Sequence, residues 1–298
     1  FSFSFCHYNQ PCMSEQSFPA QQQQTQPGLQ HKLVPEPETI RKNYRPSGKL
    51  KNKNVFITGG DSGIGRSVAV HFAEEGAANI AIICHPREKK DAEATVKMVT
   101  GRGTGCILFV GDVQQPYFCK KAATEALQAF GNINILVNNC AVQYVQEGID
   151  QISEEQLLET FQVNIFSQFR FSREIVPQMK EGDSVINTTS VLAYKGSPGL
   201  IDYATTKSAI TGFTRSLSEN LVEKGIRVNA VAPGPVWTPL VPSSFPEEKV
   251  KKFGLNTPMG RAGQPSEIGP CFVFLASEDS SYITGQVLHP NGGWVING

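Results

Sequence analysis

Two side chains that could transfer a proton are spaced one helical turn apart. Tyr203 and Lys207 are separated by four positions in the segment Y-A-T-T-K. On a helix this spacing places the phenol and the ammonium on one face. A free phenol has a pKa of about 10, and we expect the neighbouring positive charge to favour the phenolate and lower that pKa. The pair predicts a general acid and base for reversible carbonyl reduction.

A serine precedes this pair at the end of a predicted strand. Ser190 follows S-V-I-N-T-T at 184–189 and lies thirteen residues before Tyr203. Its hydroxyl could donate to a substrate oxygen, where negative charge develops as a hydride reaches the carbonyl carbon. A strand-end serine is usually a cap, and a Tyr–Lys pair on a helix is common, so each alone would be weak. Their order after a glycine-rich turn favours catalysis.

That turn is T-G-G-D-S-G-I-G at 58–65, between a predicted strand at 55–58 and a predicted helix at 63–76. Gly59 permits a tight turn, Gly63 lets the backbone approach a phosphate, and Gly65 allows close packing of the helix. The first amides of the helix and its dipole would face a pyrophosphate. A turn without a ligand is the alternative. The predicted cofactor contacts here are Gly59, Asp61, Ser62, Gly63, Ile64 and Gly65.

The end of the second predicted strand bears on the choice of nicotinamide cofactor. Sites for NAD usually place a carboxylate there, on the ribose hydroxyls. This chain reads I-C-H-P-R at 83–87, with no carboxylate before Glu88. His85 and Arg87 could instead bind a 2′-phosphate, because a guanidinium suits phosphate geometry. We therefore predict NADP, with NAD possible and a merely solvated Arg87 as the alternative.

Polar residues also follow the third and fourth predicted strands. Asp112 could accept a hydrogen bond from the adenine amine while Val113 packs beside the ring, or Asp112 could cap the next helix. Asn138 and Asn139 end the fourth strand. Their amides could fix the neighbouring loops and the cofactor ribose, and a purely structural role is the alternative.

The segments that must position these residues alternate between strands and helices. Continuous apolar strands indicate burial on both faces and a parallel sheet. We predict an α/β fold: a single doubly wound parallel sheet of the Rossmann type, with helices on both faces, in one catalytic domain at 51–298. The predicted strands lie at 55–58, 79–84, 106–111, 133–138, 184–189, 226–231 and 286–289.

The first fifty residues differ in composition from the rest. They contain a glutamine tract at 21–24 and four prolines in a polar segment at 27–46. Such a segment cannot bury enough apolar area to order itself independently. We expect 1–50 to be a polar extension, flexible or draped over the body. It lacks the signature of a transit peptide, so a cytoplasmic location is expected, with a plastid as the alternative if the true N-terminus is missing.

Composition argues against several classes of partner. Lysine plus arginine equals aspartate plus glutamate at 27 each, without a basic arm, which argues against nucleic acid or an anionic membrane. No apolar stretch approaches the roughly 20 residues that cross a bilayer. Seven scattered cysteines indicate reduced thiols, and five dispersed histidines predict no metal site. The expected partner is a small-molecule carbonyl compound or alcohol.

These motifs together resemble the short-chain dehydrogenase/reductase family. The resemblance rests on T-G-x-x-x-G-I-G at 58–65, N-N at 138–139, Y-x-x-x-K at 203–207 and P-G at 233–234, with Asn164 and Ser190 between them, in family order. It covers about residues 50–298. The segments G-G-D-S-G-I-G-R, V-A-P-G-P-V-W-T and T-P-M-G-R-A-G-Q-P are similar to the glucose/ribitol dehydrogenase-like branch, which includes NADPH-dependent aldehyde reductases. The common N-N-A-G reads N-N-C-A here.

The resemblance implies further roles. Lys207 would also bind the nicotinamide ribose, and Asn164 would hold, by its amide or backbone, a water that links Lys207 to solvent. A loop would touch the nicotinamide carboxamide, and the stretch at 237–256 would be a substrate lid. A homotetramer is implied, with the helix at 264–277 near subunit contacts. The loop contacts are Pro233, Gly234, Val236 and Thr238.

The leading expectation is a reductase of aldehydes or a dehydrogenase of sugars and polyols, dependent on NADP. One alternative is a ketoreductase of specialised metabolism, because the lid sets the substrate. Another is a non-catalytic protein that senses nucleotides, against which the intact set of Ser190, Tyr203 and Lys207 argues.

Overall fold

One sheet of seven parallel strands organises the protein. A computed structural model describes residues 17–296, and its strand order is β3-β2-β1-β4-β5-β6-β7. The strands are β1 Asn54–Thr58, β2 Asn79–Cys84, β3 Gly105–Val110, β4 Ile135–Asn138, β5 Ser184–Thr188, β6 Arg227–Val231 and β7 Val287–Leu288. The predicted doubly wound parallel sheet is therefore confirmed.

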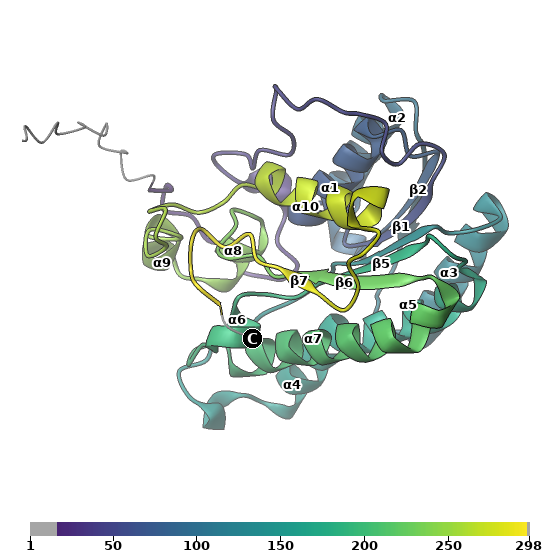
Figure 1. Cartoon of the computed structure of the whole chain (residues 1–298). Helices are drawn as coiled ribbons and strands as arrows, with labels where there is room; N and C mark the ends of the chain where they lie inside the picture. Colours follow the sequence, from purple (N-terminus) through teal and green to yellow (C-terminus); the bar gives the residue numbers. More distant parts are fainter. Residues whose placement is uncertain (1–16, 297–298) are drawn as a thin grey trace, which may run out of the picture.

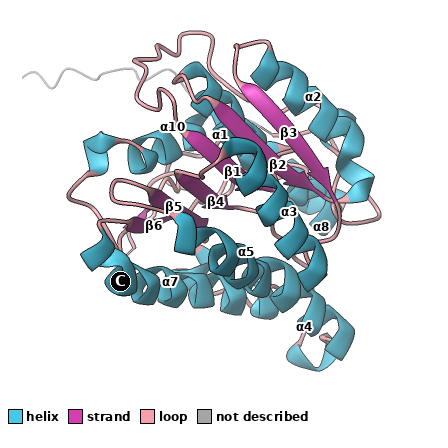
Figure 2. Cartoon of the chain, turned by 90° about the vertical axis from the view of Figure 1, so that its right-hand side faces the viewer, coloured by secondary structure: helices cyan, strands magenta, loops and turns pink. Residues whose placement is uncertain are grey.

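Helices cover both faces of this sheet (Figures 1 and 2). One face carries α1 Gly63–Glu74, α2 Lys89–Thr100 and α10 Pro265–Ala276, and the other carries α3 Pro116–Phe130, α5 Ser167–Ile175 and α7 Ile201–Leu221. The shorter helices are α4 Glu154–Phe161, α6 Leu192–Lys195, α8 Leu240–Ser244 and α9 Glu247–Lys251. Single turns of 3-10 helix lie at Gln30–Lys32, Pro86–Glu88, Ile149–Gln151, Val176–Gln178, Val222–Lys224 and Glu278–Ser280, and a π-helix lies at Gln162–Phe166.

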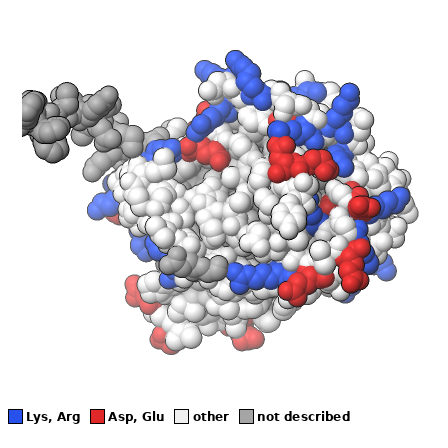
Figure 3. Space-filling model, in the orientation of Figure 1, with Lys and Arg blue, Asp and Glu red and all other residues white. Residues whose placement is uncertain are grey.

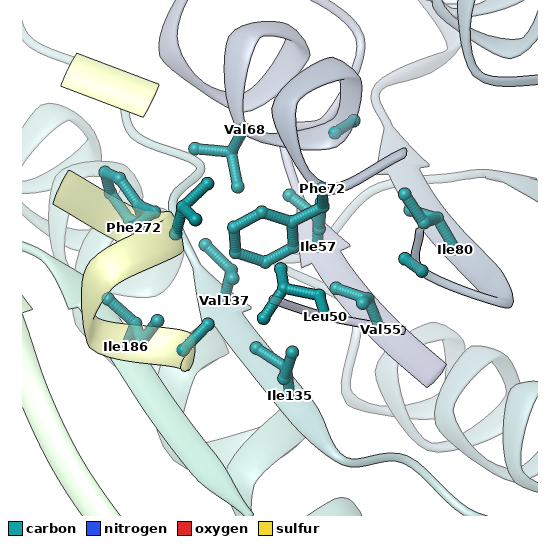
Figure 4. Packing of buried hydrophobic residues seen from close by; sticks show 14 of the residues in the cluster. Leu50, Val55, Ile57, Val68, Phe72, Ile80, Ile135, Val137, Ile186 and Phe272 are labelled. Atoms are coloured by element: carbon teal, nitrogen blue, oxygen red, sulfur yellow. The ribbon is translucent and has the colours of Figure 1, made fainter. Parts of the chain in front are cut away.

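Each face of the sheet buries its own apolar layer. Alternate residues of a strand point to opposite faces, so a run such as V-F-I at 55–57 contributes to both layers. Phe72 of α1 lies at the centre of one layer, between Ile57 of β1 and Phe272 of α10 (Figure 4). Phe56 of β1 faces the other layer, with Phe171 of α5. The continuous apolar strands therefore predicted correctly that the sheet is buried on both faces.

The edges of most elements differ from the prediction by one or two residues, and two of these differences have a local cause. Strand β4 begins at Ile135 rather than 133, because the Asn134 side chain, and not a ladder carbonyl, accepts the Asn54 N–H at 2.9 Å. Helix α1 ends at Glu74 rather than 76, and Gly76 follows with φ +85°, a left-handed backbone that stops a helix.

The described part of the N-terminal extension, residues 17–50, runs along the body (Figure 1). Phe18 stacks on Trp237 with ring centroids 3.9 Å apart, and Trp237 Nε1 donates to the Pro35 carbonyl at 2.8 Å. Further along, Tyr44 donates to the buried carboxylate of Glu75. The described part of this polar extension therefore contacts the body at several points.

Charge is spread thinly over the surface. On the face shown in Figure 3, acidic and basic side chains surround a largely uncharged middle. Among residues 17–296, no helix is both long enough and apolar enough to cross a membrane.

Candidate active site

A cavity of about 830 Å³ opens where the strands of the sheet end. Parallel strands bring their carboxyl ends to one edge, so the segments that follow β1, β2, β4 and β5 meet there. Most of the predicted site residues line the cavity: Gly59, Asp61, Ser62, Gly63, Ile64, His85, Asp112, Val113, Ser190, Tyr203, Lys207, Pro233, Gly234, Val236 and Thr238. Four do not: Gly65, Arg87, Asn138 and Asn164.

The glycine-rich turn is shaped by two close approaches. Gly59 has φ +66°, and its N–H donates to the Ile83 carbonyl at 2.9 Å, which ties the turn to β2. A Cβ on Gly65 would lie 1.9 Å from the Gly59 carbonyl oxygen. Gly65 is therefore needed for packing the helix against the turn, as the sequence predicts for it, and it does not reach the cavity.

Two buried carboxyl groups lie beside the turn. Asp61 and Glu88 both line the cavity, and both side chains are buried. Burial and the proximity of Asp61 raise the pKa of Glu88, which favours the uncharged form of this carboxyl group. Asp61 Oδ2 is buried without a hydrogen-bond partner in the described chain.

Arg87 does not face the cavity as predicted. One guanidinium nitrogen donates to the Gln26 carbonyl at 3.1 Å and another donates to the Thr25 hydroxyl. The N-terminal extension thus binds the cation that the sequence assigns to a 2′-phosphate. His85 does line the cavity, and burial lowers the pKa of its imidazole. Arg87 is also not merely solvated, since two of its nitrogens are bound.

The two asparagines at the end of β4 have different roles, because their side chains point to opposite faces of the sheet. Asn138 is fully buried inside the sheet, where its amide donates to the Asn187 side chain at 2.9 Å. Its prediction as a cofactor contact is wrong, because consecutive strand residues point to opposite faces. Asn139 lines the cavity instead, and its amide donates to the carbonyls of Thr58 and Gly59 at 3.2 and 3.1 Å.

Asp112 stabilises a local turn and also lines the cavity. Its Oδ1 accepts the Gln114 N–H at 2.9 Å, whereas the residue that precedes helix α3 is Gln115. Asp112 is therefore not the cap of that helix, and its carboxyl still lines the cavity.

The three predicted catalytic side chains meet at one wall of the cavity. The side chains of Tyr203 and Ser190 both line this wall, and both are about 8% exposed. Lys207, one turn along α7, is 1% exposed and donates from Nζ to the Thr188 carbonyl at 2.9 Å. Its Nζ lies 5.4 Å from the centroid of the Tyr203 ring.

The predicted lowering of the tyrosine pKa is not found in the protein itself. Burial raises the pKa of Tyr203 to about 12, and only the hydroxyl of Ser190 acts in the opposite direction. Burial also lowers the pKa of Lys207 to about 8. The low-polarity surroundings disfavour both charged forms, and the ammonium is directed at a backbone carbonyl instead of the phenol oxygen.

Asn164 sits in the π-helix between α4 and α5, where it bridges two segments. Its Oδ1 accepts the Val142 N–H at 2.8 Å, and its Nδ2 donates to the Val142 carbonyl at 2.9 Å and to Thr206 Oγ1 at 3.1 Å. The side-chain amide is therefore fully used in the protein. Of the two routes that the sequence left open for holding a water, the one through the backbone at Asn164 stays a prediction.

Several lining residues escape sequence reasoning. The extension contributes Gln26, Pro27 and Gly28, and the C-terminal segment contributes Trp294. Their distance along the chain from every motif left no local signal. The stretch at 237–256 forms α8 and α9 and lines the cavity with Val241, Phe245 and Phe253, among others. No group of three or more metal-ligating side chains gathers within residues 17–296.

Known proteins resemble this chain over nearly its whole length. A family model described as Enoyl-(Acyl carrier protein) reductase matches residues 59–295. Glucose and ribitol dehydrogenase of Daucus carota is 50% identical over 285 residues, which are 94% of this chain and 98% of that protein. NADPH-dependent aldehyde reductase 1, chloroplastic, of Arabidopsis thaliana is 50% identical over 282 residues, 93% of this chain and 98% of that protein.

A solved structure matches the architecture. A short chain dehydrogenase from Burkholderia cenocepacia in complex with NADP superimposes with a TM-score of 0.77 at 26% identity, covering 82% of this chain and 98% of that one. The matches extend through the glycine-rich turn and the Ser190, Tyr203 and Lys207 wall. The chain belongs to the short-chain dehydrogenase/reductase family of oxidoreductases.

Proposed function

We propose that the protein transfers a hydride between NADP(H) and the carbonyl or alcohol carbon of an aldehyde, sugar or polyol. The observation that carries the proposal is the placement of Ser190, Tyr203 and Lys207 on one wall of the cavity that begins at the glycine-rich turn. The cavity suits a dinucleotide because the glycine-rich turn and a proton donor line the same space.

Tyr203 is the proposed general acid in reduction. Since its pKa is about 12, its hydroxyl stays protonated at neutral pH and can give a proton to the oxygen of the substrate as that oxygen becomes negative. Ser190 is the proposed second donor to the same oxygen. Bound NADPH would supply the hydride. In alcohol oxidation, the phenolate form of Tyr203 would act as the base, which requires a nearby positive charge to lower its pKa.

Lys207 is proposed to keep the phenol in place and to exchange protons with it. A pKa of about 8 leaves the ammonium close to its titration point near neutral pH, which suits a group that takes up and releases protons. The carbonyl of Thr188 fixes its Nζ beside the phenol. Replenishment of the proton from a water on the π-helix backbone at Asn164 remains part of the proposal.

The preference for NADP is supported by the end of β2. An ionised carboxylate there would repel a 2′-phosphate, but burial and the neighbouring Asp61 raise the pKa of Glu88, which favours its uncharged form. His85 offers an imidazole from the same wall. The printed names of the relatives add NADPH and NADP for those proteins.

The substrate class rests on the relatives whose names give glucose, ribitol and aldehyde. Apolar side chains of the segment at 237–256, including Val241, Phe245 and Phe253, favour a second candidate, a hydrophobic ketone of specialised metabolism. The cytoplasm is the proposed location, and a plastid is the alternative that the chloroplastic relative suggests.

A homotetramer is proposed from the family and from exposed aromatic residues. Phe166, which directly precedes α5, and Phe169, which lies within α5, are 40% and 53% exposed. Apolar rings on one helical face favour subunit contact. Mass photometry at nanomolar concentration tests this: a monomer would contradict the proposal.

A substrate panel tests the function. Consumption of NADPH and NADH is followed with aldehydes, sugars and hydrophobic ketones, and formation of NADPH with polyols. We expect turnover of aldehydes or sugars with higher kcat/KM for NADPH than for NADH. Cofactor binding without turnover on any substrate would favour a nucleotide sensor.

A further inference from the structure

Two glutamine side chains hold the N-terminal extension to itself. Gln21 accepts the Val34 N–H at 3.1 Å on Oε1 and donates from Nε2 to the Val34 carbonyl. Gln23 does the same with Leu29, at 2.7 and 2.9 Å. A side-chain amide carries the donor and acceptor of a peptide unit, so each pair imitates a neighbouring strand.

A third glutamine makes the same contact to the body. Gln26 accepts the Gln143 N–H at 3.1 Å and donates to the Gln143 carbonyl. Gln143 itself lines the cavity, as do Gln26, Pro27 and Gly28. The extension is therefore one wall of the cavity and is fixed there by a pair of neutral hydrogen bonds.

Further contacts hold this wall in place at two sides of the cavity. At the end of β2, Arg87 donates to the carbonyl of Gln26 and to Thr25. At the opposite side, a Cβ on Gly28 would lie 2.3 Å from the Pro239 carbonyl oxygen, so the chain passes directly against the segment before α8. Residues 26–28, which line the cavity, therefore lie between the end of β2 and the segment before α8.

Gln30 connects this segment to the glycine-rich turn. Its Oε1 accepts the Gly63 N–H at 2.7 Å, and it is 1% exposed. Its Nε2 is buried and has no hydrogen-bond partner within residues 17–296. A buried donor without a partner is unfavourable, and here it lies next to the glycine-rich turn, although Gln30 does not itself line the cavity.

The two ends of the segment are anchored more firmly than its middle. Before it, Phe18 stacks on the fully buried Trp237. After it, the buried Asp91 accepts the N–H groups of Gln30 and His31 at 2.8 and 3.0 Å. Between these anchors the contacts are mainly neutral hydrogen bonds, each of small net strength.

We propose that residues 23–28 are a clamp of the cofactor site. They close over the bound dinucleotide and retain it, Gln26 acts as the positioning residue that holds the clamp shut, and the cofactor enters and leaves when the segment opens between its anchors. The proposal rests on the dinucleotide binding proposed above.

Two matched variants of the full chain test the clamp. Gln26→Ala removes the bridge to the body, and Gln21→Ala removes the same kind of bridge within the extension. The dissociation rate of NADPH is measured by stopped-flow fluorescence during displacement with excess NADP. We expect Gln26→Ala to release NADPH about tenfold faster, since two hydrogen bonds are lost, and Gln21→Ala to stay within about twofold of the original protein.

Amide hydrogen exchange supplies a readout that does not depend on any variant. In the unmodified protein, NADPH should slow exchange in residues 23–28 together with the turn at 59–65. Equal dissociation rates for the two variants, or protection of the turn without protection of 23–28, would overturn the clamp and leave the proposed function standing. A failure of the unmodified protein to bind NADPH would overturn both.

Discussion

The ammonium of Lys207 lies 5.4 Å from the centroid of the Tyr203 ring and on the same face of α7. The distance is too long for a hydrogen bond to the ring but short enough for the charge to act on the phenol. A proton donor and a buried cation therefore share one wall of the cavity, with opposite responses to burial: the pKa of the phenol rises and that of the ammonium falls.

Removal of the phenol oxygen should abolish turnover while leaving cofactor binding intact. Tyr203→Phe keeps the ring that packs at 8% exposure and removes only the proton. We expect kcat to fall by about 10²–10⁴-fold, as for loss of a general acid, with the Kd of NADPH nearly unchanged. The exposed Tyr117, changed to Phe, is the control for a lost hydroxyl. Near-normal turnover in Tyr203→Phe would refute the assignment.

Replacement of Lys207 by Met should change how stability depends on pH. The folded pKa is about 8 and the ordinary value is 10.5, so between these values the unfolded chain binds more protons than the folded protein. The cost of the buried ammonium is therefore largest below pH 8 and disappears toward pH 10.5. This window corresponds to roughly 3 kcal/mol.

The measurement is the difference in free energy of unfolding between the original protein and Lys207→Met, by urea titration from pH 7 to 10.5. The original protein should gain on the variant as pH rises. Lys120→Met, on the exposed face of α3, is the control for the loss of a lysine that is not buried. A flat difference for Lys207→Met would mean that burial does not perturb the ammonium.

The sequence predicts the sheet well because every strand carries a continuous apolar run and every connection a helical period. It predicts Ser190, Tyr203 and Lys207 for a related reason: catalytic residues at strand ends and on one helical face follow from spacing alone. It fails at Asn138, whose side chain is buried against the Asn187 side chain. The next residue, Asn139, lines the cavity instead.

The extension shows a different limit. Composition interprets the glutamine tract as a segment without a core, whereas the amide of Gln26 pairs with the backbone of Gln143, 117 positions away. A contact of that kind depends on where the folded body leaves a peptide unit unpaired, and no local pattern encodes it. The contacts of Arg87 could not be predicted for the same reason. Its guanidinium binds Thr25 and the Gln26 carbonyl, which are distant in the sequence, and not the cavity.

Two glycine substitutions should have opposite effects. In Gly65→Ala the new Cβ would lie 1.9 Å from the Gly59 carbonyl oxygen, so the turn or α1 must shift. We expect destabilisation by about 1–3 kcal/mol and at least tenfold weaker NADPH binding. In Gly212→Ala the Cβ meets no atom within 4 Å inside helix α7, and a gain of about 0.5–1 kcal/mol is expected. Thermal unfolding and titration with NADPH are measured for both variants. Equal effects of the two substitutions would show that the close approach of Gly65 to the Gly59 carbonyl limits neither stability nor NADPH binding.

The stack of Phe18 on Trp237 should control the anchoring of the extension. Phe18 is 3% exposed, and the two rings are 3.9 Å apart with an interplanar angle of 10°. Loss of the ring in Phe18→Ala removes apolar burial and the stack, which together stabilise the attached state by about 2–3 kcal/mol. Trp237, fully buried in the original protein, should then be partly exposed.

Tryptophan emission measures this directly. The chain has two tryptophans, so the experiment uses a Trp294→Phe background in which Trp237 is the single emitter. Phe18→Ala should shift the emission to longer wavelength and speed proteolysis within the extension, while global unfolding of the sheet domain changes little. Val34→Ala, at a side chain that is 63% exposed in the same extension, serves as the control. Unchanged emission in Phe18→Ala would mean that Pro35, whose carbonyl accepts the Trp237 indole N–H at 2.8 Å, is sufficient to hold the segment in place.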